Sequence, residues 1–82
     1  MSIQSEIKQF ILQNYLFTSD ESRLADGDSL MGKGIVDSTG ILELIMHVEE
    51  TYDVKVLDQE MIPDNFDSVA NIVAFVERKR GR

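Results

Sequence analysis

The sequence predicts an all-α fold, a small four-helix bundle with a long loop between helices 1 and 2 and a short third helix. Apolar residues recur at intervals of three and four positions in three separate segments, which is the periodicity of amphipathic helices. No two neighbouring segments alternate apolar and polar residues as paired strands do. The chain has 82 residues and no cysteine, so residues 1–82 are expected to form one domain stabilised by helix packing alone.

The first helix is predicted over residues 2–16, with Ser2 as its cap. Lys8 is the only basic residue on its polar face, whereas a helix that lies on a membrane usually has a basic polar face. Packing into the bundle is therefore the better interpretation. The apolar positions that would face the core are Ile3, Ile7, Phe10, Ile11 and Tyr15.

Residues 17–37 are predicted to form a long loop, because Gly, Ser and Asp are frequent there. Loops of this length are uncommon in compact domains and are often functional. Four apolar residues should hold it against the bundle: Leu24, Leu30, Ile35 and Val36. We expect a short turn to dock Leu30 into the core.

The second helix is predicted to begin at Ser38 or Thr39 and to end near Thr51 or Tyr52. Asp37 and Ser38 are both residue types that cap helices, and a hydroxyl at the positive end of a helix is well placed to hold a phosphate. The apolar stripe consists of Ile41, Leu42, Leu44, Ile45, Val48 and Tyr52, and the other face carries Glu43, Glu49 and Glu50.

A short extended link is expected over residues 53–56, followed by a helical turn over residues 58–62 that Pro63 ends. This turn is the predicted short third helix. Residues 63–65 are interpreted as a small insertion between it and the last helix.

The last helix should be capped by Asp67 or Ser68 and should end in a basic tail, residues 78–82. Its buried stripe would contain Val69, Ile72, Val73 and Val76, with Phe66 before the cap and Phe75 near the stripe's edge. The whole predicted core is Ile7, Phe10, Ile11, Leu30, Leu42, Ile45, Val48, Phe66, Val69, Ile72 and Val73.

The formal net charge of −7 comes from 15 acidic and 8 basic side chains. Nucleic acid binding requires a cationic surface, so it is not expected. An acidic protein of this kind is soluble and suits partners with basic docking patches. The chain has no uninterrupted apolar run of about 18 residues and no basic, apolar leader, so we expect no membrane span and a cytoplasmic location.

The segment GIVDST at residues 34–39, followed by LELIM-x-VEE-x-Y at residues 42–52, resembles the attachment helix of acyl carrier proteins. The likeness extends over nearly the whole chain. It implies that Ser38 is esterified with 4′-phosphopantetheine, whose terminal thiol carries cargo as a thioester. It also implies that a phosphopantetheinyl transferase adds this arm from coenzyme A, and that Asp37 supports the divalent metal of that enzyme, a role compatible with capping the helix.

The resemblance further implies that partner enzymes bind this helix through basic residues. The recognition residues it implies are Glu43, Met46, Glu49, Glu50 and Asp53. For the acidic residues the alternative is a solvated face, and Met46 could instead turn into the core. The partners would be a ligase that loads an acyl or aminoacyl group and downstream synthases or transferases, and the carrier itself is expected to be a monomer.

The cargo is where the sequence departs from the fatty-acid type, which usually reads Asp-Ser-Leu followed by an acidic residue. Thr39 and Gly40 occupy those places here. The main interpretation is a carrier of acyl intermediates of the fatty acid or polyketide type. An aminoacyl or D-alanyl carrier is the alternative, because Asp-Ser-x-Gly is more similar to such specialised carriers. A hypothesis of another class is an unmodified acidic helical module that binds proteins.

The chain is not expected to be an enzyme. Ser38 and His47 lie nine residues apart on one predicted helix, about two and a half turns, so their side chains cannot meet. The acidic segment at residues 26–28 lacks the spacing of a calcium-binding loop, so no metal site is predicted.

Overall fold

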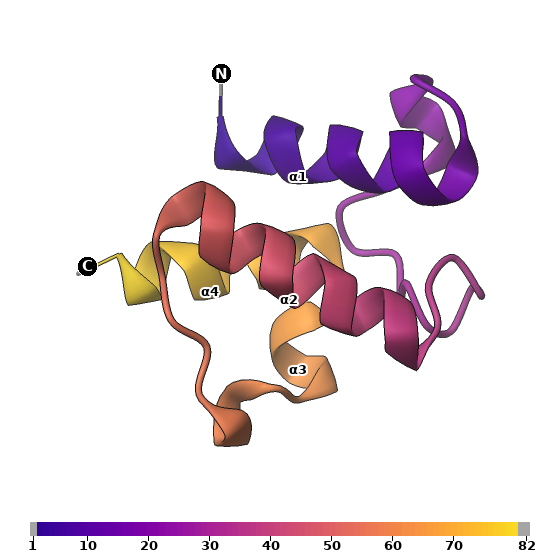
Figure 1. The fold of residues 1–82 in the computed structure, drawn as a ribbon. Helices are drawn as coiled ribbons and strands as arrows, with labels where there is room; N and C mark the ends of the chain where they lie inside the picture. The colour runs from indigo at the N-terminus through magenta and orange to yellow at the C-terminus, as the bar shows by residue number, and fades with distance from the viewer. Residues whose placement is uncertain (1, 81–82) are drawn as a thin grey trace.

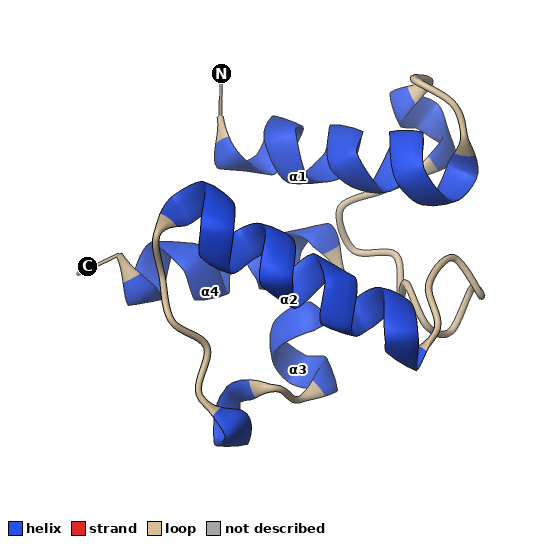
Figure 2. Ribbon diagram, in the orientation of Figure 1, coloured by secondary structure: helices blue, strands red, loops and turns tan. Residues whose placement is uncertain are grey.

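The computed structural model describes residues 2–80, which form helices and loops without any strand (Figure 2). The all-α prediction is therefore confirmed for this part of the chain. The α-helices are α1 (Ile3–Ile11), α2 (Ser38–Tyr52), α3 (Pro63–Phe66) and α4 (Val69–Lys79). Short 3-10 helices span Glu21–Arg23 and Asp58–Glu60, and a π-helix continues α1 over Leu12–Leu16.

The first helical segment has the predicted extent. Ser2 caps it, because its side chain accepts a hydrogen bond from the Ser5 N–H at 3.1 Å. Apolar spacing did not predict that its last turn widens into a π-helix, which is followed by Phe17 with a left-handed backbone, φ 56°. The widened turn carries Tyr15, which faces α2.

The long loop is fastened to the bundle at its apolar residues, as predicted. Leu24 and Leu30 are fully buried and Val36 nearly so. Asp67, between α3 and α4, holds the turn around Leu30: its carbonyl accepts the Leu30 N–H at 2.7 Å, and its carboxylate accepts the Ser29 hydroxyl at 2.6 Å. The loop that leads into α2 therefore has a fixed course despite its length.

A helical turn is present over residues 58–60, as predicted, but it is a 3-10 turn and its identification with the short third helix is wrong. The short α-helix begins at Pro63, within the segment interpreted as an insertion. Proline lacks an N–H, but the first residue of a helix needs none, so Pro63 starts α3 instead of ending a helix. Ser68 rather than Asp67 caps α4, accepting the Asn71 N–H at 3.1 Å.

Two predictions about the core are also wrong. Leu42 is 55% exposed, whereas Leu44, absent from the predicted core, is fully buried. Phe75 lies in the core rather than at its edge, with its ring centroid 5.0 Å from that of Phe66. The other predicted core residues are buried or pack against the core as partly exposed side chains, as Phe10 and Val73 do.

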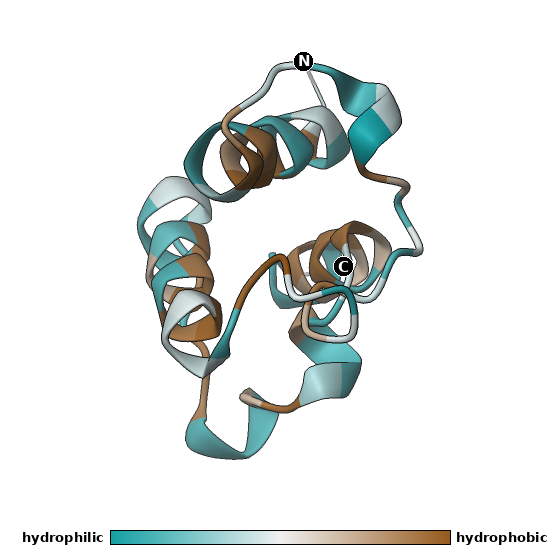
Figure 3. Ribbon diagram, turned by 90° about the vertical axis from the view of Figure 1, so that its right-hand side faces the viewer, coloured by the Kyte–Doolittle hydropathy of each residue, from teal (hydrophilic) through white to brown (hydrophobic). Residues whose placement is uncertain are grey.

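The helices surround this core with their apolar faces turned inward (Figure 3). α1 and α2 run side by side, joined by contacts between their side chains, and α4 packs against α1 (Figure 1). Ser38 lies at the end of α2 that is next to the long loop. Lys79 and Arg80 of the basic tail lie within the described part, whereas Gly81 and Arg82 lie outside it.

Candidate functional site

Ser38 is the first residue of α2, and its side chain is exposed. Asp37 caps the helix: its carboxylate accepts the Gly40 N–H at 2.8 Å, and its carbonyl accepts the Ile41 N–H at 2.9 Å. The Ser38 and Thr39 N–H groups have no acceptor among residues 2–80. The accessible Ser38 hydroxyl thus lies beside two N–H groups that are free to donate hydrogen bonds, at the positive end of a 15-residue helix.

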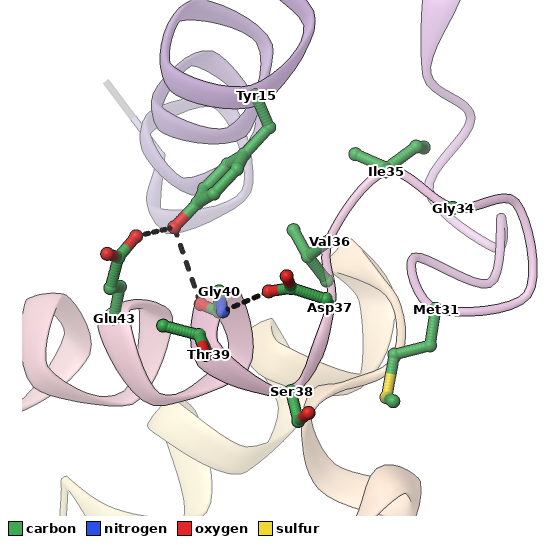
Figure 4. A pocket seen from close by; sticks show the side chains of 10 residues that line it. All are labelled: Tyr15, Met31, Gly34, Ile35, Val36, Asp37, Ser38, Thr39, Gly40 and Glu43. Carbon is green, nitrogen blue, oxygen red and sulfur yellow. Dashed lines mark hydrogen bonds between the residues drawn. The ribbon is translucent and has the colours of Figure 1, made fainter.

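Ser38 stands between two depressions of different character. The first, of about 680 Å³, has a mixed lining, in which the polar side chains of Asp37, Thr39 and Glu43 lie beside apolar ones such as Ile35 and Val36 (Figure 4). In Figure 4 the Ser38 hydroxyl points away from Tyr15 and Glu43, so it is free to react from outside.

The second depression is an apolar groove of about 280 Å³ between α2 and α3. It contains the exposed side chains Met31, Leu42, Met61 and Ile62, together with Pro63 and the edge of the core at Ile41, Ile45 and Phe66. Exposed apolar side chains gathered in one place commonly mark a binding surface. Leu42 lines this groove, which explains why its side chain is exposed and not part of the core.

Tyr15 joins the first helical segment to the start of α2. Its hydroxyl donates to the Glu43 carboxylate at 2.7 Å and lies 3.4 Å from the Gly40 carbonyl (Figure 4). Burial, and then the hydrogen bond to Glu43, raises the pKa of Tyr15 to about 12, so the phenol remains a donor at neutral pH. A Cβ at Gly40 would lie 3.3 Å from the Tyr15 ring and 3.1 Å from Val36 Cβ, which makes glycine the residue that fits this contact.

The five residues expected to recognise partners all lie on α2 or directly after it. Met46, Glu50 and Asp53 are exposed. Glu43 is exposed as well, but it accepts the Tyr15 hydrogen bond. Glu49 is half-buried, and its carboxylate accepts the Val56 N–H at 2.9 Å. Two of the five carboxylate and thioether side chains therefore also have an intramolecular role.

The apolar groove beside Ser38 was not predicted from the sequence. The signal available was the position of Leu42, which lies three and four residues before Ile45 and Met46 and so shares their side of the helix. Met61 and Ile62 lie between the 3-10 turn and α3, where the sequence predicted that the helical turn continues. Their proximity to Ser38 depends on how α3 packs and could not be read from spacing.

His47 is not aligned with Ser38 for catalysis. Its ring stacks on Phe10 with centroids 3.8 Å apart and planes at 14°, on the seam between α1 and α2. Burial lowers the pKa of His47, which favours the neutral ring in this stack. Within residues 2–80 no three His, Asp or Glu side chains form a cluster able to hold a metal ion.

Asp26, one of the acidic residues considered for calcium, has a partner within the chain. The Nζ of the buried Lys8 lies 2.7 Å from its carboxylate, and the Gln4 amide donates to the same oxygen at 2.8 Å.

No helix in the described part of the chain is long and apolar enough to cross a membrane.

Comparison with known proteins shows relatives over almost the whole chain. Proteins named D-alanyl carrier protein from Streptococcus pyogenes serotype M5 (strain Manfredo), serotype M49 (strain NZ131) and serotype M1 are each 38% identical to it over 77 residues. The match covers 94% of this chain and 94% of each relative. No family model matches the sequence.

Proposed function

This chain belongs to the carrier protein family that includes D-alanyl carrier proteins, and from that premise we propose that Ser38 carries a 4′-phosphopantetheine arm. The protein would hold an aminoacyl group, D-alanine being the one that its relatives' name indicates, and present it to partner enzymes. When attached, the arm supplies the terminal thiol on which the cargo is held as a thioester.

The observation that supports this proposal is the exposed hydroxyl of Ser38 at the amino end of α2. The residues around it suit a phosphodiester. The N–H groups of Ser38 and Thr39 have no acceptor within the described residues and can donate to phosphate oxygens, and the helix dipole favours the remaining negative charge. Asp37 is kept from competing for those donors, because its carboxylate already accepts the Gly40 N–H.

The chain's part in the modification is that of a nucleophile. The Ser38 oxygen forms a bond to the phosphorus of coenzyme A that bears the pantetheine, the pyrophosphate bond breaks, and the adenosine bisphosphate leaves. The hydroxyl proton passes to a base of the transferase, because His47 lies nine positions further along the same helix and cannot reach Ser38. The Asp37 carboxylate, exposed beside Ser38, would support the divalent metal of the transferase.

An aminoacyl cargo suits this structure better than the fatty acyl cargo of the main sequence interpretation. The relatives are named for D-alanine. The central aliphatic residues, such as Ile11, Leu44 and Val48, are fully buried and packed against one another. A group as small as alanine needs no opening of that core, whereas sheltering a long chain would require displacing side chains at a cost of the order of 1–3 kcal/mol.

Partner enzymes would recognise the face of α2 that borders the apolar groove. Met46 and Leu42 supply adaptable and apolar contacts, and Glu50 and Asp53 supply exposed negative charge for a basic rim. Glu43 and Glu49 would contribute through the carboxylate oxygens that their internal hydrogen bonds leave free. Such a surface would serve the transferase, a loading ligase and a downstream transferase in turn.

Mass spectrometry after incubation with coenzyme A, Mg²⁺ and a broad-range phosphopantetheinyl transferase tests the proposal. One phosphopantetheine should be added to the wild type and none to Ser38→Ala. Thr39→Ala is the matched control, because it removes the neighbouring exposed hydroxyl and should leave the modification intact. An unmodified wild type would instead favour the acidic protein-binding module, for which Ser38→Ala would leave partner binding unchanged.

A further inference from the structure

We infer that Tyr15 is a positioning residue for Ser38: by holding the first turns of α2 from a neighbouring helical segment, it fixes the orientation in which the serine is presented to the transferase. This inference rests on the proposed function of Ser38. It concerns a side chain 23 positions earlier in the sequence, which sequence reasoning assigned only to the first apolar stripe.

The contact reaches the helix at the turn that contains the serine. Gly40 lies two residues after Ser38, its N–H is bound by Asp37 at 2.8 Å, and its carbonyl lies 3.4 Å from the Tyr15 hydroxyl. Glu43, one turn further along, accepts the same hydroxyl at 2.7 Å. Tyr15 therefore contacts both of the turns that follow the attachment position.

The first turn of a helix is the part that most needs such support. Its N–H groups have no partner within the helix, and helix ends open more readily than helix centres. Asp37 satisfies one of these groups from within the same segment. Tyr15 adds a restraint from outside the helix: its ring and hydroxyl lie against Gly40 in the first turn, and its hydrogen bond to Glu43 in the second turn holds them there.

The chain contains a second contact of the same chemistry at the opposite end of α2. The Tyr52 hydroxyl donates to the Glu6 carboxylate at 2.7 Å. Each of the two adjacent helical segments thus gives one tyrosine and one glutamate, and the two bonds lie at opposite ends of the pair. Tyr52→Phe removes the same hydroxyl from the same seam, 14 positions from Ser38, and serves as the matched control.

The experiment compares steady-state modification of wild type, Tyr15→Phe and Tyr52→Phe by the same transferase with coenzyme A. Hydrogen exchange at the hydrogen-bonded amides of the first turn, those of Gly40 and Ile41, is measured in parallel on the unmodified proteins. Loss of the Tyr15 hydrogen bond should lower kcat by about three- to tenfold and speed this exchange by a similar factor, with KM within about twofold of wild type. Tyr52→Phe should leave kcat and the exchange of the first turn within about twofold of wild type, because it loosens the other end.

Substitution of the acceptor provides a rescue test. Glu43→Gln and Glu43→Ala both remove the carboxylate charge proposed for partner recognition, so a loss of docking should raise KM equally in both. Only Glu43→Gln keeps an oxygen that can accept the Tyr15 hydroxyl, so its kcat should exceed that of Glu43→Ala, which should match that of Tyr15→Phe. The double variant Tyr15→Phe/Glu43→Ala should have a kcat no lower than that of either single variant, because both substitutions remove the same hydrogen bond.

Three results would overturn the inference: an unchanged kcat for Tyr15→Phe, an equal fall for Tyr52→Phe, or an effect confined to KM. The last would make Tyr15 a docking contact. In each of these cases the wild type is still modified, so the proposed function stands. A wild type that accepts no phosphopantetheine would remove the proposed function and this inference together.

Discussion

Asp53, the residue that follows α2, holds a conformation that is unfavourable for its side chain and its charge. Its backbone is left-handed, with φ 54° and ψ 49°. An L-residue with a Cβ pays about 1 kcal/mol or more there, although aspartate tolerates it better than most. Its carboxylate also lies at the negative end of the helix dipole, which costs about 0.3–1 kcal/mol. Both penalties act on the folded state.

Asp53→Gly should therefore stabilise the protein by about 1 kcal/mol, which for a domain of this size raises Tm by about 4–8 °C. Asp53→Asn removes only the charge and should gain about 0.3–0.5 kcal/mol. Asp53→Ala removes the charge but keeps a Cβ, and should be less stable than the glycine variant by about 1 kcal/mol. Urea unfolding followed by far-UV circular dichroism measures all three.

The order of these variants tests the two causes separately. If the glycine variant is no more stable than the alanine variant, the backbone conformation is not what limits stability, and the reasoning from φ fails. If the asparagine variant gains nothing, the charge is irrelevant. The same variants should weaken binding of a basic partner enzyme if Asp53 belongs to the recognition surface, so stability and recognition would change in opposite directions.

Three further predictions concern the site and the core. Asp37→Ala should lower the free energy of unfolding by about 1 kcal/mol by removing the helix cap, measured by urea unfolding, and should also slow the modification of Ser38. The Lys8 ammonium holds the pKa of Asp26 below its usual range. This pair therefore stabilises the fold above about pH 4, and its contribution is lost as the pH falls through the folded-state pKa of Asp26. Asp26→Asn should flatten the acid side of the curve of unfolding free energy against pH. Leu42→Ser should change stability by less than about 0.5 kcal/mol, whereas Leu44→Ala should cost about 2–5 kcal/mol, and equal effects would contradict the assignment of Leu42 to the surface.

The sequence was sufficient for the elements whose apolar periodicity is long. α1, α2 and α4 were predicted within a few residues, and the burial of Leu24, Leu30 and Val36 in the loop was predicted from their isolation among turn formers. Local capping chemistry also identified the start of α2. These are properties of short segments, and a short segment carries enough information to determine them.

The features that escaped prediction depend on contacts between distant segments. Pro63 can end one helix or begin another, and only the packing of Phe66 into the core decides in favour of the second. The stripe of α2 is broad enough that Leu42 fits either face by spacing. The Tyr15 contact joins residues 28 positions apart, and no periodicity indicates which glutamate on α2 accepts the hydroxyl.

The attachment position combines a fixed backbone with an uncommitted side chain. Asp67 holds the turn at Leu30 before Ser38, and Asp37 and Tyr15 hold the helix after it. The Ser38 hydroxyl nevertheless points away from Tyr15 and Glu43 (Figure 4). A serine that a second protein must modify benefits from this combination, because the entropy of ordering its backbone is lost during folding and not during the encounter. The partner then needs to orient only one side chain. For this reason we expect substitutions at the restraints to affect the rate of modification more than affinity, and substitutions in the apolar groove to affect affinity more than rate.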